Sequence, residues 1–166
     1  MIAMEAETVG TFQLARLERT DEEALRRFFF RLSPDTLYRR FLSPIARPEQ
    51  ARPERLLDID HRDREALVAL VDGEIVGVAR YVRKPGAELA DLAVVVADAW
   101  QRRGIATLLL RTLAEAAGAI GIRGFSVTML ADNRPVLGLV LSLQPATRLE
   151  VSGGVFEGVM PLPWTA

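Results

Sequence analysis

One stretch near the middle of the chain constrains the fold more than any other. It begins with Val94, Val95 and Val96, three consecutive β-branched residues that suit a strand covered on both faces. A short polar turn containing Gly104 follows, and the leucine-rich stretch up to Gly118 has helical spacing. A buried strand, a glycine turn and a long helix together predict an α/β domain with an anion site at the strand-to-helix junction.

The residues of this turn have the chemistry of a phosphate site. The first backbone amides of a helix lack partners within the helix and carry partial positive charge. Gly104 lets the backbone approach a phosphate closely, Ala106 is small, and Thr107 adds a hydroxyl. Arg102 and Arg103 suit a ligand with several phosphates, because guanidinium groups donate directed hydrogen bonds to them. The alternative is that the glycine serves only a tight turn.

Composition and spacing argue against several other classes of function. The chain has no cysteine and one histidine, so a disulfide framework, a thiolate nucleophile and a metal site with Cys or several His ligands are not expected. The net charge of -1 argues against a nucleic-acid binder. The turn is not the Gly-x-Gly-x-x-Gly dinucleotide fingerprint, and no Gly-Lys-Ser/Thr of a Walker loop occurs.

The rest of the chain predicts a single mixed domain over residues 1–166. Thr20 and Glu23 have the spacing of a capping box, and Asp132 or Asn133 can cap the last helix. The expected order is β-α-α-β-β-β-α-β-α-β-β, with a loop and a short helix after the second helix. We expect strands over 8–17, 66–71, 75–82, 89–96, 125–130, 148–151 and 155–160, and helices over 21–32, 33–42, 49–57, 104–118 and 132–143.

These motifs resemble those of a known family. Val94–Val96, then Gln101-Arg102-Arg103-Gly104-Ile105-Ala106, then a leucine-rich helix, is similar to motif A of the GNAT N-acetyltransferase superfamily, which reads Gln/Arg-x-x-Gly-x-Gly/Ala. Asp132-Asn133-Arg134 resembles motif B. The order of elements also matches, so the resemblance covers nearly the whole chain. It implies a mixed, mostly antiparallel central sheet with helices on both faces, in which strands 89–96 and 125–130 splay apart.

The resemblance also implies a donor and the residues that hold it. The donor is acetyl-CoA, with coenzyme A as the product. Backbone groups of the 89–96 strand would pair with the pantetheine arm and polarise the thioester carbonyl, amides of the turn would hold the pyrophosphate, and Asn133 would face the pantetheine or the thiol. The implied cofactor-binding residues are Val94, Val95, Val96, Gln101, Arg102, Arg103, Gly104, Ile105, Ala106, Thr107 and Asn133.

Further segments resemble one group of proteins within this superfamily. Ser33–Phe41, and Ala90–Ala93 with Val96–Gln101, resemble the GNAT domains of bacterial protein lysine acetyltransferases. The expected function is therefore transfer of an acetyl group to a primary amine by direct attack on the thioester, with protein lysine as the first acceptor considered and a small amine as the second. Two alternatives are a non-catalytic acyl-CoA-binding module and a domain that binds another nucleotide.

Asp91 is the expected catalytic base. Aspartate is disfavoured in strands, yet Asp91 lies in an otherwise apolar one, where the lysine acetyltransferases carry a glutamate. The shorter side chain favours proton transfer through water over direct abstraction. The alternative is a carboxylate at the strand edge that faces solvent or an arginine, and Glu88 would then be the substitute base.

Two positions depart from the family pattern. Many members use a tyrosine in the last helix to protonate the leaving thiolate, and that position falls at Val140; the only tyrosines are Tyr38 and Tyr81. Leu143-Gln144-Pro145 replaces a glycine–aromatic pair, which puts the path into the final hairpin in doubt.

Location and partners follow from weaker signals. No stretch approaches the roughly 18 apolar residues of a membrane span, and the N-terminal residues lack the basic and apolar regions of a signal peptide. We therefore expect a cytoplasmic protein that binds acetyl-CoA and an amine acceptor, with no nucleic-acid or membrane partner. A homodimer through the C-terminal strands is a further hypothesis.

Overall fold

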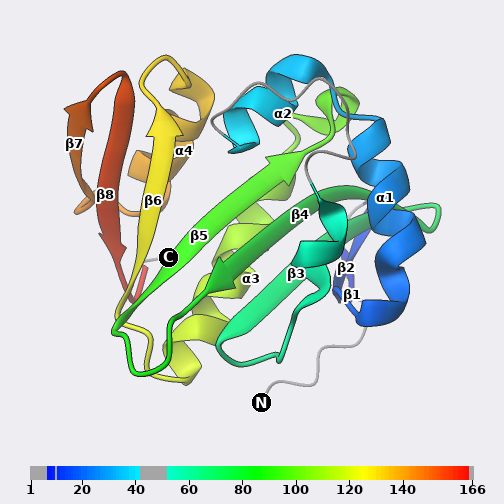
Figure 1. Ribbon diagram of the computed structural model, residues 1–166, viewed down its shortest axis with the longest axis horizontal. Coiled ribbons are helices and arrows are strands. Elements are labelled where there is room, and N and C mark those ends of the chain that lie inside the picture. The colour runs from blue at the N-terminus through cyan, green and yellow to red at the C-terminus, as the bar shows by residue number, and fades with distance from the viewer. Residues whose placement is uncertain (1–6, 10, 42–51, 165–166) are drawn as a thin grey trace.

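The computed structural model describes residues 7–9, 11–41 and 52–164, which form one mixed, eight-stranded sheet with helices packed against it (Figure 1). The strand order is β1-β2-β3-β4-β5-β6-β8-β7, and only the β5–β6 pair is parallel in this part of the chain. The strands are β1 (Glu7–Val9), β2 (Phe12–Arg16), β3 (Arg64–Val71), β4 (Glu74–Val82), β5 (Leu89–Val96), β6 (Gly124–Leu130), β7 (Arg148–Ser152) and β8 (Val155–Pro161). The helices are α1 (Glu22–Phe30), α2 (Pro34–Phe41), α3 (Ile105–Ala119) and α4 (Arg134–Leu143), with short 3-10 helices η1 (Arg19–Asp21), η3 (Pro53–Leu57) and η4 (Asp98–Trp100).

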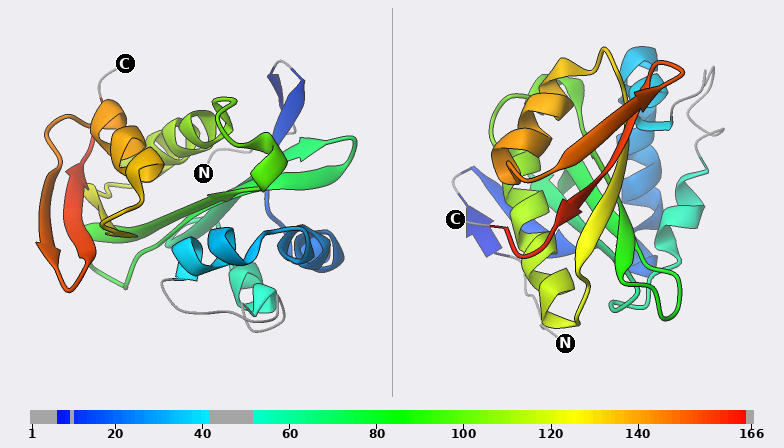
Figure 2. Two further views of the ribbon diagram at one scale, coloured as in Figure 1. Left: turned by 90° about the horizontal axis from the view of Figure 1, so that it is seen from above. Right: turned by 90° about the vertical axis from the view of Figure 1, so that its left-hand side faces the viewer.

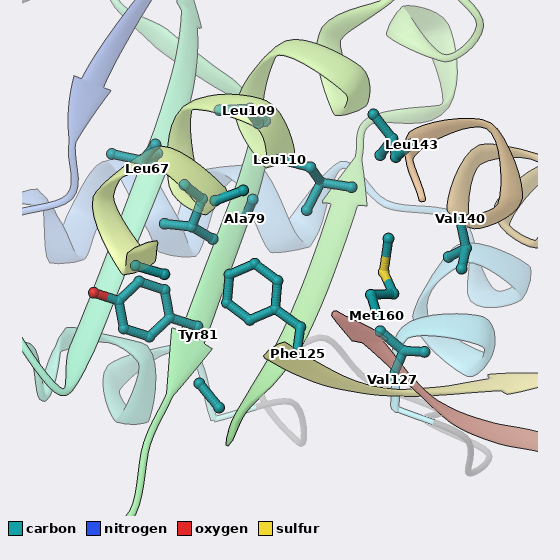
Figure 3. Close-up of a cluster of buried hydrophobic side chains, with 14 of the residues drawn as sticks. Leu67, Ala79, Tyr81, Leu109, Leu110, Phe125, Val127, Val140, Leu143 and Met160 are labelled. Carbon is teal, nitrogen blue, oxygen red and sulfur yellow. The ribbon is translucent and has the colours of Figure 1, made fainter. Parts of the chain in front are cut away.

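The helices form two layers, with α1 and α2 on one face of the sheet and α3 and α4 on the other (Figure 2). Helix α3 packs against β3, β4 and β5 and buries Leu109 and Leu113 in the second layer, where Figure 3 shows Leu109. Helix α1 buries Phe28 and Phe29 in the first layer. The central strands β3 and β4 are therefore covered on both faces, and the predicted arrangement of a mostly antiparallel sheet between helices is confirmed.

Strand β5 contacts its parallel neighbour along a short stretch only. Pairing with β6 joins Leu89 to Gly124, Ala90 to Phe125 and Asp91 to Ser126, and the ladder stops there. The other edge of β5 stays paired with β4 up to Val96. Figure 1 shows β5 and β6 together at their first residues and diverging toward their far ends. The expected splay between these two strands is confirmed.

Helix α3 packs closely on β4. A Cβ added at Gly77 of β4 would lie 3.1 Å from Cγ2 of Ile105 and 3.3 Å from Cδ1 of Leu109. The missing side chain therefore lets the first two turns of α3 approach the sheet. This contact fixes the helix N-terminus beside the end of β5.

Three local predictions were wrong or lie partly outside the described residues. The strand expected over 8–17 is a hairpin of β1 and β2. The capping box joins Glu18 and Asp21 around η1 instead of Thr20 and Glu23, because a 3-10 turn precedes α1 and moves its start to Glu22. The described part of the helix expected over 49–57 is the 3-10 helix η3, and residues 42–51 lie outside the described residues.

Candidate active site

The gap between β5 and β6 opens into a cleft of about 1030 Å³. Its floor is formed by β5, one wall by β6 and α4, and the other wall by α2 and the turn that leads into α3. From Leu92 onward, the edge of β5 that faces the cleft has no strand partner in the described part of the chain. Its backbone donors and acceptors are therefore available to an extended ligand.

The turn after β5 lines this cleft and leads into the N-terminus of α3. Arg102 has a φ of 63° and Gly104 a φ of 80°, so two residues of the turn adopt the left-handed conformation. The side chain of Gln101 anchors the turn, because its Nε2 donates to the carbonyl of Val96 at 3.0 Å. No side chain caps the N-terminus of α3, where Gly104 is the N-cap residue. Left-handed residues before an uncapped helix make an anion-binding concavity, which fits the phosphates of the expected donor.

Most of the expected cofactor-binding residues lie at the cleft. Arg103 is the exception: it does not line the cleft, and its guanidinium lies over the ring of Trp100, 4.7 Å from the centroid. Asn133 is buried and caps α4, where its Oδ1 accepts from the backbone amide of Val136 at 3.5 Å. The expected residues that line the cleft are Val94, Val95, Val96, Gln101, Arg102, Gly104, Ile105, Ala106, Thr107 and Asn133.

Asp91 also lines the cleft, at the point where the two strands part. It is the last residue of β5 paired with β6, and its Oδ1 accepts a hydrogen bond from the hydroxyl of Ser126. The side chains of Leu92 and Val94 pack in the core beneath α3, whereas Val95 packs beneath α1 and α2. Because side chains alternate along a strand, the carboxylate of Asp91 lies on the α2 face.

Helix α2 is tied to the turn by a carboxylate that the sequence interpretation missed. Asp98 accepts from the amide of Ser33 at 3.1 Å, from its hydroxyl at 2.7 Å and from the hydroxyl of Thr36 at 3.0 Å. Partial burial works against its charge, but the hydrogen bonds from Ser33 and Thr36 outweigh it and hold the pKa of Asp98 below its usual range. The start of α2 therefore has a fixed position at the cleft wall.

Two arginines of the cleft were also missed. Arg40 of α2 and Arg80 of β4 both line it. Burial, and secondly the charge of Arg80, lower the pKa of Arg40 to about 10. Burial lowers the pKa of Arg80, and the charge of Asp58 acts in the opposite direction. A signal was present in the sequence, because Arg80 interrupts an apolar strand as Asp91 does.

Neither tyrosine lines the cleft that the described residues form. Tyr81 is buried in the core, its hydroxyl donates to the carbonyl of Arg62 at 2.8 Å, and burial raises its pKa. Val140 of α4 lines the cleft and is buried. Among the described residues, no group of three or more acidic or histidine side chains could hold a metal ion. No helix in the described segments has the length and apolar character needed to span a membrane.

The amino-acid sequence of this chain is similar to those of known proteins. The sequence matches the model of the acetyltransferase (GNAT) family over residues 22–142. An acetyltransferase of Pseudomonas aeruginosa is 37% identical over 131 residues, which cover 76% of this chain and 70% of that protein. Acetyltransferase Pat of Mycolicibacterium smegmatis is 36% identical over 104 residues, which cover 61% of this chain and only 31% of Pat.

Solved structures agree with these matches. The GNAT domain of PAT from S. lividans has a TM-score of 0.83 at 28% identity, and the alignment covers 92% of both chains. The PaiA N-acetyltransferase of Thermoplasma acidophilum, solved in complex with coenzyme A, has a TM-score of 0.75 at 17% identity over 92% of this chain and all of that one. The second likeness shows the fold alone.

Proposed function

The chain belongs to the acetyltransferase (GNAT) family, and we propose that it transfers the acetyl group of acetyl-CoA to a primary amine with Asp91 as the base. The observation that carries this proposal is the position of the Asp91 carboxylate, which lines the cleft where β5 and β6 separate. The resemblance of residues 33–41, 90–93 and 96–101 to protein lysine acetyltransferases makes protein lysine the first acceptor considered, and a small amine is the second candidate.

Two features of the chain would hold the donor. The unpaired edge of β5, from Leu92 to Val96, offers backbone groups to the amides of the pantetheine arm. The amides from Arg102 to Thr107 lie at the uncapped N-terminus of α3 and would bind the pyrophosphate. Bound acetyl-CoA supplies the activated thioester. A backbone amide of β5 beside that thioester would stabilise negative charge on its carbonyl oxygen.

Asp91 would prepare the amine for attack. A primary amine such as a lysine side chain has a pKa of about 10.4 and arrives as ammonium at neutral pH. The carboxylate of Asp91 takes this proton, through water because its side chain is short, and Ser126 orients the carboxylate by its hydrogen bond. The amine nitrogen then bonds to the acetyl carbon, the carbon–sulfur bond breaks, and its electron pair leaves on sulfur. The second proton that the nitrogen loses as the amide forms passes through solvent to this sulfur.

The leaving thiolate has no tyrosine partner among the described residues. The position expected for such an acid, Val140, is apolar, and Tyr81 is committed to the core. A coenzyme A thiol is acidic enough to leave without full protonation. The reaction proposed here therefore needs one protein acid–base group, Asp91.

The expected homodimer is supported by an exposed apolar side chain at the edge of the sheet. Val151 of β7 is 60% exposed. Strand β7 is the terminal strand of the sheet, and its outer edge has no strand partner among the described residues. We propose that a second copy would pack there, and analytical ultracentrifugation of wild type and Val151→Lys would test it.

A coenzyme A release assay with acetyl-CoA and panels of lysine peptides and small amines tests the reaction. Asp91→Asn removes the base while nearly preserving side-chain shape, so kcat should fall by roughly 10²- to 10⁴-fold. The affinity for acetyl-CoA should stay close to that of wild type. Glu88→Gln is the matched control, because Glu88 is exposed, lies outside the cleft and forms only a 3.8 Å ion pair with Arg123.

The two variants separate the alternatives. Loss of turnover in Glu88→Gln but not in Asp91→Asn would assign the base to Glu88 and contradict the proposal. Tight acetyl-CoA binding without turnover on any amine would instead identify a non-catalytic acyl-CoA-binding module.

A further inference from the structure

Besides Arg102 of the turn, three arginines line the cleft, and two of them, Arg40 and Arg80, differ from Arg39 in their partners. Arg39 forms ion pairs with Asp35 at 3.0 Å and with Asp132 at 3.3 Å. Arg40 and Arg80 form no ion pair with any carboxylate of the described residues. The Arg40 guanidinium lies over the ring of Phe41, 4.7 Å from its centroid.

The carboxylates that line the same cleft have other partners. Asp35 is paired with Arg39, Asp98 accepts three hydrogen bonds from Ser33 and Thr36, and Asp91 accepts from Ser126. Asp58, the acidic group whose charge acts on Arg80, lies 3.6 Å from Arg64. The cleft wall therefore holds two guanidinium groups that form no ion pair with the described residues, although the charge of Asp58 acts on Arg80.

Two like charges in a partly buried wall are unfavourable unless an anion joins them. Burial disfavours the charge of both guanidinium groups, and the charge of Arg80 disfavours that of Arg40 further, whereas Asp58 favours the charge of Arg80. Side chains kept in such an environment at a cleft are candidates for ligand binding. Guanidinium groups bind carboxylate and phosphate in a fixed geometry, so the missing partner is an anion of this kind.

The phosphates of the donor are poorly placed to supply that anion. Arg80 is opposite Ala93 on the neighbouring strand, three residues before Val96, and a strand rises about 3.3 Å per residue. Arg80 is therefore roughly 10 Å along β5 from the turn that would hold the pyrophosphate. Like Val78 two residues earlier, it lies on the α2 face of β4, opposite the face that carries α3.

The position of Asp91 relates this anion site to the amine. Asp91 is opposite Val82 of β4, which is two residues from Arg80 on the same face. The carboxylate and the Arg80 guanidinium therefore originate about 7 Å apart along the strands. A ligand with an amine at one end and an anion a few atoms away would reach both.

We propose that the acceptor is a small amine that carries a carboxylate or a phosphate, with its anionic group bound by Arg40 and Arg80 and its amino group facing Asp91. This inference rests on the acetyltransferase function proposed above and deepens it by naming the class of acceptor. It selects the small amine over protein lysine. The bonds made and broken are those of the reaction already described.

Two matched series of acceptors test the anion requirement. The first contains β-alanine, phosphoethanolamine, ethanolamine and ethylenediamine, which share a two-carbon spacer and differ in the terminal charge. The second compares Nα-acetyl-lysine with its uncharged amide. We expect kcat/KM for the anionic members to exceed that for ethanolamine by roughly tenfold to a hundredfold, as charge-assisted hydrogen bonds predict. Comparison of β-alanine with phosphoethanolamine distinguishes carboxylate from phosphate.

Variants then assign the preference to the two arginines. Arg80→Gln and Arg40→Gln should each reduce the ratio of kcat/KM for the anionic amine over ethanolamine toward one, mainly through KM of the anionic amine. Arg123→Gln is the control, because Arg123 is exposed and lies outside the cleft. A loss of acetyl-CoA affinity in Arg80→Gln would assign the arginine to the donor phosphates and overturn the inference.

The remaining outcomes separate the inference from the function. Equal kcat/KM for anionic and neutral amines, or a strong preference for lysine peptides, would overturn the anionic acceptor and leave the acetyltransferase intact. If acetyl-CoA binds but no amine is acetylated, the proposed function fails. Calorimetric titration of β-alanine and phosphoethanolamine into the coenzyme A complex then tests the anion site independently of turnover. Binding that is lost in Arg80→Gln would support the site, and no binding would overturn it.

Discussion

A buried carboxylate organises the ionisable residues at the start of β3. Glu65 is only 4% exposed, and its oxygens lie 2.8 Å from Nδ1 of His61 and 3.5 Å from Nε of Arg16. The other ring nitrogen of His61 lies 3.1 Å from a carboxylate oxygen of Glu18. A histidine held between two carboxylates is stabilised in its protonated form.

We expect the contribution of His61 to stability to depend on pH. Burial works against the charged ring, but the hydrogen bonds to Glu65 and Glu18 outweigh it and raise the pKa of His61. A raised folded-state pKa contributes stability that is fully present below the unfolded value of about 6.5 and is lost as pH rises through the folded value. His61→Asn should therefore destabilise the protein more at about pH 5.5 than at about pH 8.5.

Denaturant unfolding of both proteins across this pH range measures the effect. Asparagine suits the site because His61 has a φ of 57°, which asparagine tolerates well. A stability difference that stays constant with pH would show that the ring contributes through packing. Glu18→Gln, which removes one of the two partners, should reduce the pH dependence without abolishing it.

At the scale of elements, the junction of β5 and α3 depends on the backbone of one glycine. Gly104 has a φ of 80°, and a Cβ there would meet nothing within 4 Å. Glycine is therefore needed here for its backbone conformation and not for lack of space. Gly104→Ala should lower the free energy of unfolding by about 1–2 kcal/mol. The same change should weaken acetyl-CoA binding, because a shift in φ redirects the amides at the start of α3.

Gly118, near the end of the same helix, provides the matched control. It also has open space around its Cα but has no positive φ. Alanine is favoured over glycine in a helix by roughly 1 kcal/mol, so Gly118→Ala should stabilise the protein and leave acetyl-CoA affinity unchanged. Thermal unfolding and isothermal titration with acetyl-CoA measure both effects, and similar behaviour of the two variants would contradict the argument.

Elements with a strong local pattern were predictable from the sequence. The apolar strand at 89–96, its glycine turn and the helix after it follow one another so closely that their residues and their order identify the junction. The same holds for the Asp72-Gly73 hairpin between β3 and β4. The start of α1 was not predictable, because the 3-10 turn closed by Glu18 and Asp21 competes with an equally good capping pattern at Thr20.

The candidate site was predictable only in part, because several of its contacts join distant segments. Asp98 contacts Ser33 across 65 residues of sequence, and Ser126 contacts Asp91 across 35. The spacing of residues along each segment does not indicate such contacts between distant segments. His61 illustrates the same limit, since the fold brings Glu18, 43 residues away in sequence, to its ring.

At the scale of the whole molecule, two hydrophobic cores share one sheet. Residues of β3 and β4 enter both cores, as Leu67 does on the α3 face and Val68 on the α1 face. Neither layer of helices can separate without exposing the other side of the same strands. We therefore propose that residues 1–166 unfold as one domain.

Differential scanning calorimetry tests this cooperativity. A single transition should appear, with equal calorimetric and van't Hoff enthalpies. Leu113→Ala on one face and Phe29→Ala on the other should each lower the midpoint of that one transition, because both remove buried side chains, at a cost of about 2–5 kcal/mol each. Two transitions, with each variant shifting only one, would contradict a single cooperative unit.

The early end of the β5–β6 ladder gives this sheet an edge in its interior as well as at its two sides. Edges with free amides are where chains add strands and aggregate, and their amide protons exchange quickly with solvent. A ligand bound in this gap would form hydrogen bonds with the free edge of β5, as a neighbouring strand would. Amide exchange in the second half of β5 should therefore slow when acetyl-CoA is present, and the protein purified without it should aggregate more readily than the complex.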